Sequence, residues 1–94
     1  MGAESEGLRP TSVMIVDDQR YARLGLALMI RKAPDLYVVA EAGDGQEALE
    51  VLERLNRSTG LPDVVLMDVR MPGMDGISAT RAMAQRFPTV KALV

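Results

Sequence analysis

The chain has 94 residues, of which 48% are hydrophobic and 26% are charged, and its formal net charge is −2 at pH 7. This mild negative charge gives no sign of the basic face that nucleic-acid binding requires, and no apolar run reaches the roughly 18 residues of a membrane span. Because the sequence contains neither cysteine nor histidine, disulfides, thiol chemistry and imidazole ligands are excluded, the composition fits a reducing cytoplasm, and any chemistry must use oxygen ligands.

The N-terminal part of the chain predicts a polar leader followed by a strand. Residues 1–12 are polar and carry glycine and glutamate, so we expect a disordered leader there and one ordered domain over residues 13–94. Residues 13–16 (VMIV) form a continuous apolar run that ends at Asp17 and Asp18. Such a run predicts a short strand that is buried on both faces of a sheet.

A helix and a second strand are predicted next. Residues 20–32 predict a helix, because apolar side chains recur at helical spacing and cations stand at the C-terminal end, where the helix dipole favours them. Residues 36–42 (LYVVAEA) are rich in β-branched side chains and predict a strand, which a turn at residues 43–45 (GDG) closes. The apolar side chains at helical spacing are Tyr21, Leu24, Leu28 and Met29.

The alternation of helix and strand continues along the chain. Residues 46–55 predict an amphipathic helix, residues 64–67 (VVLM) a buried strand that ends at Asp68, residues 77–87 a third helix and residues 90–94 a fourth strand. Strands and helices that alternate with short connections predict an α/β domain with a parallel sheet and right-handed crossovers. In open sheets of this class, ligands bind beyond the carboxyl ends of the strands.

Three aspartates follow the predicted strands. Asp17, Asp18 and Asp68 stand at carboxyl ends, so they meet in one crevice if the first and third strands are neighbours. Carboxylates this close repel one another, and a hard divalent cation relieves the repulsion. Carboxylates, a backbone carbonyl and water are the ligands that Mg²⁺ prefers, whereas zinc and copper favour the absent cysteine and histidine. An aspartate beside such an ion can also act as a nucleophile and form an aspartyl-phosphate.

Each of these aspartates also has a purely structural interpretation. A single Asp after a strand is more commonly a cap or turn residue, and the pair Asp17-Asp18 is more commonly a helix-start signal. What favours a functional site is the combination of three acids on two strand ends with a loop rich in proline and glycine, residues 69–76 (VRMPGMDG), after only one of them.

These residues resemble the receiver domain of bacterial two-component response regulators over residues 13–94. Residues 13–18 (VMIVDD) resemble the first strand and acidic pair of that family, and residues 68–76 (DVRMPGMDG) resemble its phosphorylation strand and the following loop. Residues 24–26 (LGL) and 38–49 (VVAEAGDGQEAL) are most similar to the NarL/LuxR branch. Full-length members of that branch usually add a helix-turn-helix domain that binds DNA.

The resemblance implies a fold, a site and partners. The family fold is the flavodoxin-like doubly wound parallel sheet with strand order 2-1-3-4-5. Asp68 would accept a phosphoryl group from a histidine kinase, Asp18 would bind Mg²⁺ directly, Asp17 would bind it mainly through water, and the backbone carbonyl of Arg70 would complete the protein's share of the coordination. Members are signalling switches rather than turnover enzymes. The resemblance implies transcription control through a DNA-binding domain outside this segment, with no membrane partner.

The sequence departs from complete receivers at its C-terminal end. Those domains are longer and carry a Ser or Thr after the fourth strand and a Lys after the fifth, whereas this sequence ends at Val94. Thr89 and Lys91 stand at the start of the fourth predicted strand, and Lys32 ends the first helix, so none of them replaces the missing groups. We therefore expect an incomplete receiver, truncated at the C-terminus, with about four strands and three helices.

An uncovered apolar strand at the edge of a sheet favours association with another chain, so we expect a homodimer or a domain-swapped assembly. Two other functions stay open. One is a Mg²⁺-dependent phosphohydrolase with an aspartyl nucleophile, although such enzymes typically carry Asp-x-Asp on the first strand and this chain reads Asp17-Asp18-Gln19. The other is an interaction fragment without phosphoryl chemistry.

Overall fold

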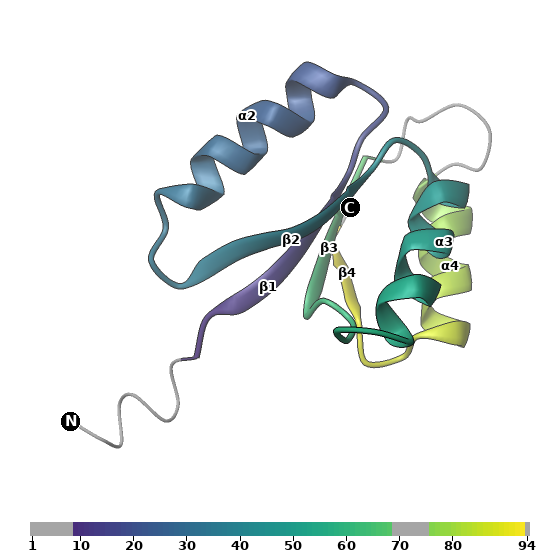
Figure 1. The fold of residues 1–94 in the computed structure, drawn as a ribbon. Helices are drawn as coiled ribbons and strands as arrows, with labels where there is room; N and C mark the ends of the chain where they lie inside the picture. The colour runs from purple at the N-terminus through teal and green to yellow at the C-terminus, as the bar shows by residue number, and fades with distance from the viewer. Residues whose placement is uncertain (1–8, 69–75, 94) are drawn as a thin grey trace.

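The computed structural model describes residues 9–68 and 76–93 and shows a four-stranded parallel sheet with helices on both faces (Figure 1). The strand order is β2-β1-β3-β4, which confirms the doubly wound α/β fold with its predicted order. The elements are β1 (Thr11–Val16), α2 (Arg20–Arg31), β2 (Leu36–Ala42), α3 (Gly45–Asn56), β3 (Val64–Met67), α4 (Gly76–Arg86) and β4 (Lys91–Leu93). Among the described residues, no helix has both the length and the apolar character that crossing a membrane requires.

Strand β1 lies at the centre of the sheet and is almost completely buried. It begins at Thr11, two residues before the predicted apolar run, because Thr11 and Ser12 pair with Leu36 and Tyr37 of β2. Strand β1 therefore includes residues 11 and 12 of the segment that we predicted as a leader, residues 1–12. Hydrophobicity did not indicate these two positions, since backbone hydrogen bonding to a neighbouring strand does not require apolar side chains.

Helices α3 and α4 lie side by side on one face of the sheet and enclose the larger apolar core (Figure 1). Met14 and Val16 of β1, Val65 and Met67 of β3, and Leu52 of α3 are buried there. The start of α3 is stabilised by a reciprocal cap, in which the Asp44 side chain accepts a hydrogen bond from the Glu47 N–H at 2.7 Å and Glu47 accepts one from the Gly43 N–H at 2.7 Å. β1 and β3, which pair with each other in parallel, both contribute side chains to this core.

Of the helices in the described part of the chain, only α2 covers the opposite face (Figure 1). It packs on the sheet through Leu26, Ala27 and Ile30. The helix is confirmed, but the four apolar side chains whose spacing predicted it point away from this core: Tyr21, Leu24, Leu28 and Met29 are 85%, 53%, 49% and 70% exposed. Apolar residues occur on several sides of α2, so its helical period predicts the helix without deciding which side meets the sheet.

Candidate functional site

The carboxyl edge of the sheet brings together the three predicted aspartates. Asp17 and Asp18 follow β1, Asp68 follows β3, and the two strands pair in parallel with Val16 opposite Met67. The Asp68 N–H donates to the Val16 carbonyl at 3.0 Å, which continues the pairing to the acid itself. One carboxylate oxygen from each of the three residues lies within 4.8 Å of the others. The fourth predicted ligand, the carbonyl of Arg70, lies outside the described residues.

Neither member of the acidic pair is the N-cap residue of α2. The residue that caps α2 is Gln19, and no side-chain hydrogen bond caps this helix. Asp17 Oδ1 accepts a hydrogen bond from the Gln19 N–H at 2.9 Å, so Asp17 orders the turn between β1 and α2. Asp18 is exposed, and Asp17 and Asp68 are half-buried. The pair therefore shapes the turn and still presents its carboxylates at the edge of the sheet.

The donor set at this edge fits a hard divalent cation. All three side chains offer oxygen, and their separation brings them within reach of one ion. Their partial exposure leaves space for water, which Mg²⁺ retains when it binds to proteins. Three neighbouring carboxylates also carry an electrostatic repulsion that a cation would remove.

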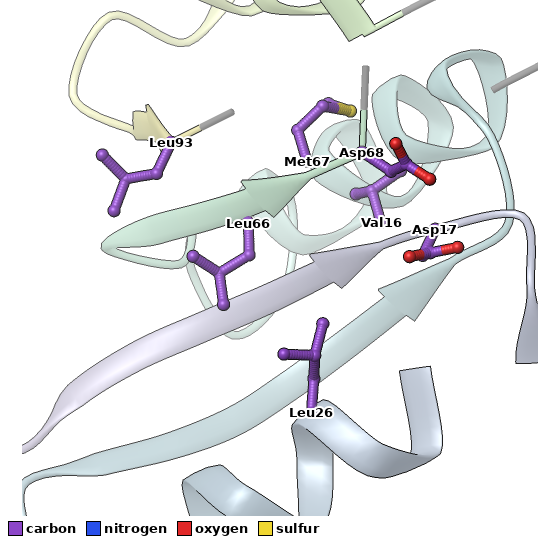
Figure 2. Close-up of a pocket in the computed structure, with 7 residues that line it drawn as sticks. All are labelled: Val16, Asp17, Leu26, Leu66, Met67, Asp68 and Leu93. Carbon is purple, nitrogen blue, oxygen red and sulfur yellow. The ribbon is translucent and has the colours of Figure 1, made fainter. Parts of the chain in front are cut away.

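An open pocket of about 280 Å³ begins at the acidic cluster and extends over the face of the sheet that α2 only partly covers. Figure 2 shows the carboxylates of Asp17 and Asp68 at one end of this pocket and apolar side chains along the rest of it. The apolar lining consists of Val16, Leu26, Leu66, Met67 and Leu93. Asp17 and Asp68 thus form the polar end of an otherwise apolar pocket.

The other polar residues that we considered lie elsewhere. Lys91 pairs with Val64 at the start of β3, and its N–H donates to the Asp63 carbonyl at 3.1 Å, so it lies at the amino edge of the sheet. From Val64 to Asp68 a strand advances about 13 Å, which separates Lys91 from the acids. Thr89 precedes Lys91, and Lys32 follows the C-terminal end of α2. None of the three occupies the acidic edge, as we expected from the sequence.

Arg23 also lies at this edge, although the sequence did not predict a role for it. Arg23 of α2 donates from Nη1 to the backbone carbonyl of Asp17 at 2.5 Å, and its Nε donates to Glu41 Oε1 of β2 at 3.2 Å. A signal was available, because Arg23 stands in the first turn of α2, where the helix dipole disfavours a cation. A cation at such a position suggests that a hydrogen-bond acceptor or an anion lies nearby, but the sequence alone does not identify that residue.

A doubly wound parallel sheet with acids at the carboxyl ends of β1 and β3 is the architecture of a CheY-like signalling module. The family model of the response regulator receiver domain matches residues 13–94. The chain therefore belongs to the response regulator receiver family.

Known relatives agree with this assignment. The chain is 42% identical over 82 residues to the transcriptional regulatory protein DegU of Brevibacillus brevis, which covers 87% of this chain and 33% of the relative. It is 42% identical over 77 residues to protein-glutamate methylesterase/protein-glutamine glutaminase 2 of Nitratidesulfovibrio vulgaris, covering 82% of this chain and 20% of that protein. The chain thus spans a third or less of the length of these curated relatives.

A solved structure supports the similarity to the NarL/LuxR branch of the family. The signal receiver domain of the putative response regulator NarL from Mycobacterium tuberculosis superimposes with a TM-score of 0.77 at 32% identity. The match covers 89% of this chain and 64% of that one. The similarity to NarL-type receivers that we noted in residues 24–26 and 38–49 is consistent with this match.

Proposed function

We propose that this chain is a phosphoacceptor module that takes a phosphoryl group onto Asp68 with Mg²⁺ held by Asp17, Asp18 and Asp68 and by the backbone carbonyl of Arg70. The observation that carries the proposal is the approach of the three carboxylates, from two neighbouring strands, to within 4.8 Å. Membership of the receiver family supports phosphorylation as the purpose of this cluster. The donor is a phosphohistidine of a partner kinase.

The chemistry is an in-line displacement at phosphorus. A carboxylate oxygen of Asp68 forms a bond to phosphorus while the bond from phosphorus to the imidazole nitrogen of the donor breaks. The departing nitrogen keeps the electron pair, and the product is an acyl phosphate on Asp68. When bound, Mg²⁺ neutralises charge on the phosphoryl oxygens. Asp17 and Asp18 would hold the ion, and Asp68, which is half-buried, would present its carboxylate beside them.

We also propose that the biological output of this module is control of transcription. DegU is a transcriptional regulatory protein, whereas the methylesterase relative carries a different activity, so receivers of this type accompany more than one output. The similarity to the NarL/LuxR branch favours transcription control in the cytoplasm, through a helix-turn-helix domain that binds the DNA. This module would then act as a switch rather than a turnover enzyme, and its net charge of −2 does not favour direct contact with nucleic acid.

Self-association is the second partner that we propose. Leu93 of the edge strand β4 is 50% exposed, and the pocket beside it is apolar. The outer side of α2 adds four exposed apolar residues to the same half of the molecule, namely Tyr21, Leu24, Leu28 and Met29. Burying this surface in a homodimer or a domain-swapped assembly would remove it from water. Light scattering that finds a monomer at all concentrations, together with a cooperative thermal transition, would contradict this.

Phosphorylation can be tested directly by intact mass. The chain is incubated with Mg²⁺ and a small-molecule phosphodonor such as acetyl phosphate, and compared with Asp68→Asn and with the matched control Asp63→Asn at the other edge of the sheet. We expect one phosphoryl group on the unmodified chain and on Asp63→Asn, and none on Asp68→Asn. Continuous release of phosphate without a stable adduct would indicate a phosphohydrolase instead. Absence of uptake with and without metal would indicate an interaction fragment.

A further inference from the structure

Arg23 connects three elements at the acidic edge. From α2, its guanidinium reaches the Asp17 carbonyl at the end of β1 through Nη1, at 2.5 Å, and Glu41 of β2 through Nε, at 3.2 Å. A methyl group placed on Gly43 would lie 3.7 Å from the same Nη1, so the guanidinium also lies against the turn that follows β2. Its side chain is only 20% exposed, which is low for an arginine.

The bond to the Asp17 carbonyl acts on the peptide group that joins Asp17 to Asp18. Fixing this carbonyl fixes the rotation of that peptide, and with it the directions in which the two neighbouring side chains leave the backbone. The Asp17 side chain is restrained separately by the Gln19 N–H at 2.9 Å. The planar guanidinium suits this task, because it offers several donors in a rigid arrangement and its charge strengthens each hydrogen bond.

Such restraint is needed because the acids oppose the arrangement. Asp17, Asp18 and Asp68 have oxygens within 4.8 Å of one another, and their repulsion favours rotation of the turn away from β3. A ligand set that is already in place before the cation arrives binds it more tightly than one that must be ordered on binding. Residues that orient metal ligands from behind typically change metal affinity by about 10–100-fold when removed.

We propose that Arg23 is a positioning residue of the metal site, which holds the Asp17–Asp18 peptide so that both carboxylates face Asp68. The inference rests on the proposed function, because it assumes that the cluster binds Mg²⁺. A positioning role and a simple charge effect predict opposite changes in Mg²⁺ affinity when Arg23 is removed. Arg23 is a cation near a cation site, so Coulomb repulsion alone would make its removal strengthen Mg²⁺ binding. Loss of positioning makes its removal weaken binding.

The test measures the Mg²⁺ dissociation constant of the 94-residue chain and of variants by following backbone amide NMR signals during titration with Mg²⁺ alone. The same spectra report whether each variant is folded. Arg23→Gln removes the charge and the guanidinium, and Arg23→Lys keeps the charge without the fork of donors. The matched control is Arg86→Gln, which removes another arginine–glutamate pair between elements, Arg86 of α4 with Glu53 of α3, away from the acidic edge.

We expect Arg23→Gln to raise the dissociation constant about tenfold, Arg23→Lys to raise it by a smaller factor, and Arg86→Gln to leave it unchanged even where it lowers the melting temperature. Unchanged or tighter binding by Arg23→Gln would overturn the positioning role and leave the proposed function intact. If Arg23→Gln does not fold, Arg23→Lys decides, and binding by Arg23→Lys equal to that of the unmodified chain would overturn the inference. Failure of the unmodified chain to bind Mg²⁺ would overturn both proposals together.

Discussion

At the amino edge of the sheet, Asp63 is surrounded by hydrogen-bond donors, whereas at the carboxyl edge Asp17, Asp18 and Asp68 face one another. Asp63 Oδ2 accepts from the N–H of the buried Ser12 at 2.9 Å and from its hydroxyl at 3.2 Å, and Arg9 lies 3.6 Å from Oδ1. At the carboxyl edge, three carboxylates come within 4.8 Å of each other. Ser12 and Arg9 stabilise the Asp63 carboxylate, whereas the three neighbouring carboxylates at the carboxyl edge together suit an external cation.

An aspartate side chain thus joins two strands at one edge, and three aspartates form a candidate metal site at the other. Asp63 links β3 to β1, because its own N–H also donates to the Ser12 hydroxyl at 2.9 Å. The acidic cluster lies across the same two strands, but repulsion within it works against the fold. Each of the following experiments tests whether the amino edge stabilises the fold while the carboxyl edge opposes it.

The largest change in stability is expected from Asp63→Ala. This variant removes the acceptor of both Ser12 donors, and we expect the free energy of unfolding to fall by about 1–2 kcal/mol. Urea denaturation measures the change. Asp63→Asn is the matched control, since its amide oxygen can still accept one of the hydrogen bonds and should restore part of the loss. Equal stability of Asp63→Ala and the unmodified chain would show that this edge does not join the strands energetically.

Mg²⁺ is expected to produce the next largest change in the free energy of unfolding, by binding at the carboxyl edge of the sheet. At ten times its dissociation constant, a ligand of the folded state raises the free energy of unfolding by about 1.4 kcal/mol. Denaturation with and without Mg²⁺ should show this gain in the unmodified chain and in Asp63→Ala, because distant sites contribute additively. Asp68→Asn should show a smaller gain. A gain that disappears in Asp63→Ala would mean that the two edges are not independent.

Acid should weaken the amino edge. The pKa of Asp63 is lowered from 3.8, chiefly by the hydrogen bond from the Ser12 backbone N–H, while the Ser12 hydroxyl and Arg9 add to the shift and burial opposes it. Because the folded state holds the proton less tightly than the unfolded state, the stabilisation is present above about pH 4 and is lost as the pH falls through the lowered pKa. Urea midpoints measured between neutral and acidic pH should decline less in Asp63→Asn. An identical decline in both proteins would assign the acid sensitivity to other groups.

The smallest effect is expected from Asp18→Asn without metal. Removing one negative charge from the cluster relieves repulsion, so the free energy of unfolding should rise by a few tenths of a kcal/mol, within the usual range of about 0.5 kcal/mol for exposed positions. The same variant should bind Mg²⁺ less tightly. Differential denaturation at low ionic strength, where repulsion is least screened, measures the gain. A loss of stability would show that Asp18 contributes to the turn rather than opposing it.

Local pattern determined the order of the elements and the identity of the acidic residues. Apolar runs of strand length and amphipathic segments between them are properties of neighbouring positions. They therefore predicted β1 to β4 and the three helices to within two residues at every boundary. The convergence of Asp17, Asp18 and Asp68 followed from strand order, because the carboxyl ends of adjacent parallel strands meet at one edge.

Tertiary structure decided which polar groups meet and which side of α2 is buried. Ser12 and Asp63 are 51 positions apart, and Arg23 reaches Asp17 and Glu41 on two different strands, so these contacts exist only once the register of the sheet is set. Likewise, Leu26 and Ile30 pack on the sheet while Leu24 and Leu28 do not. Apolar period specifies that a helix has a buried side, but the choice among several apolar sides depends on the surface that the other strands present.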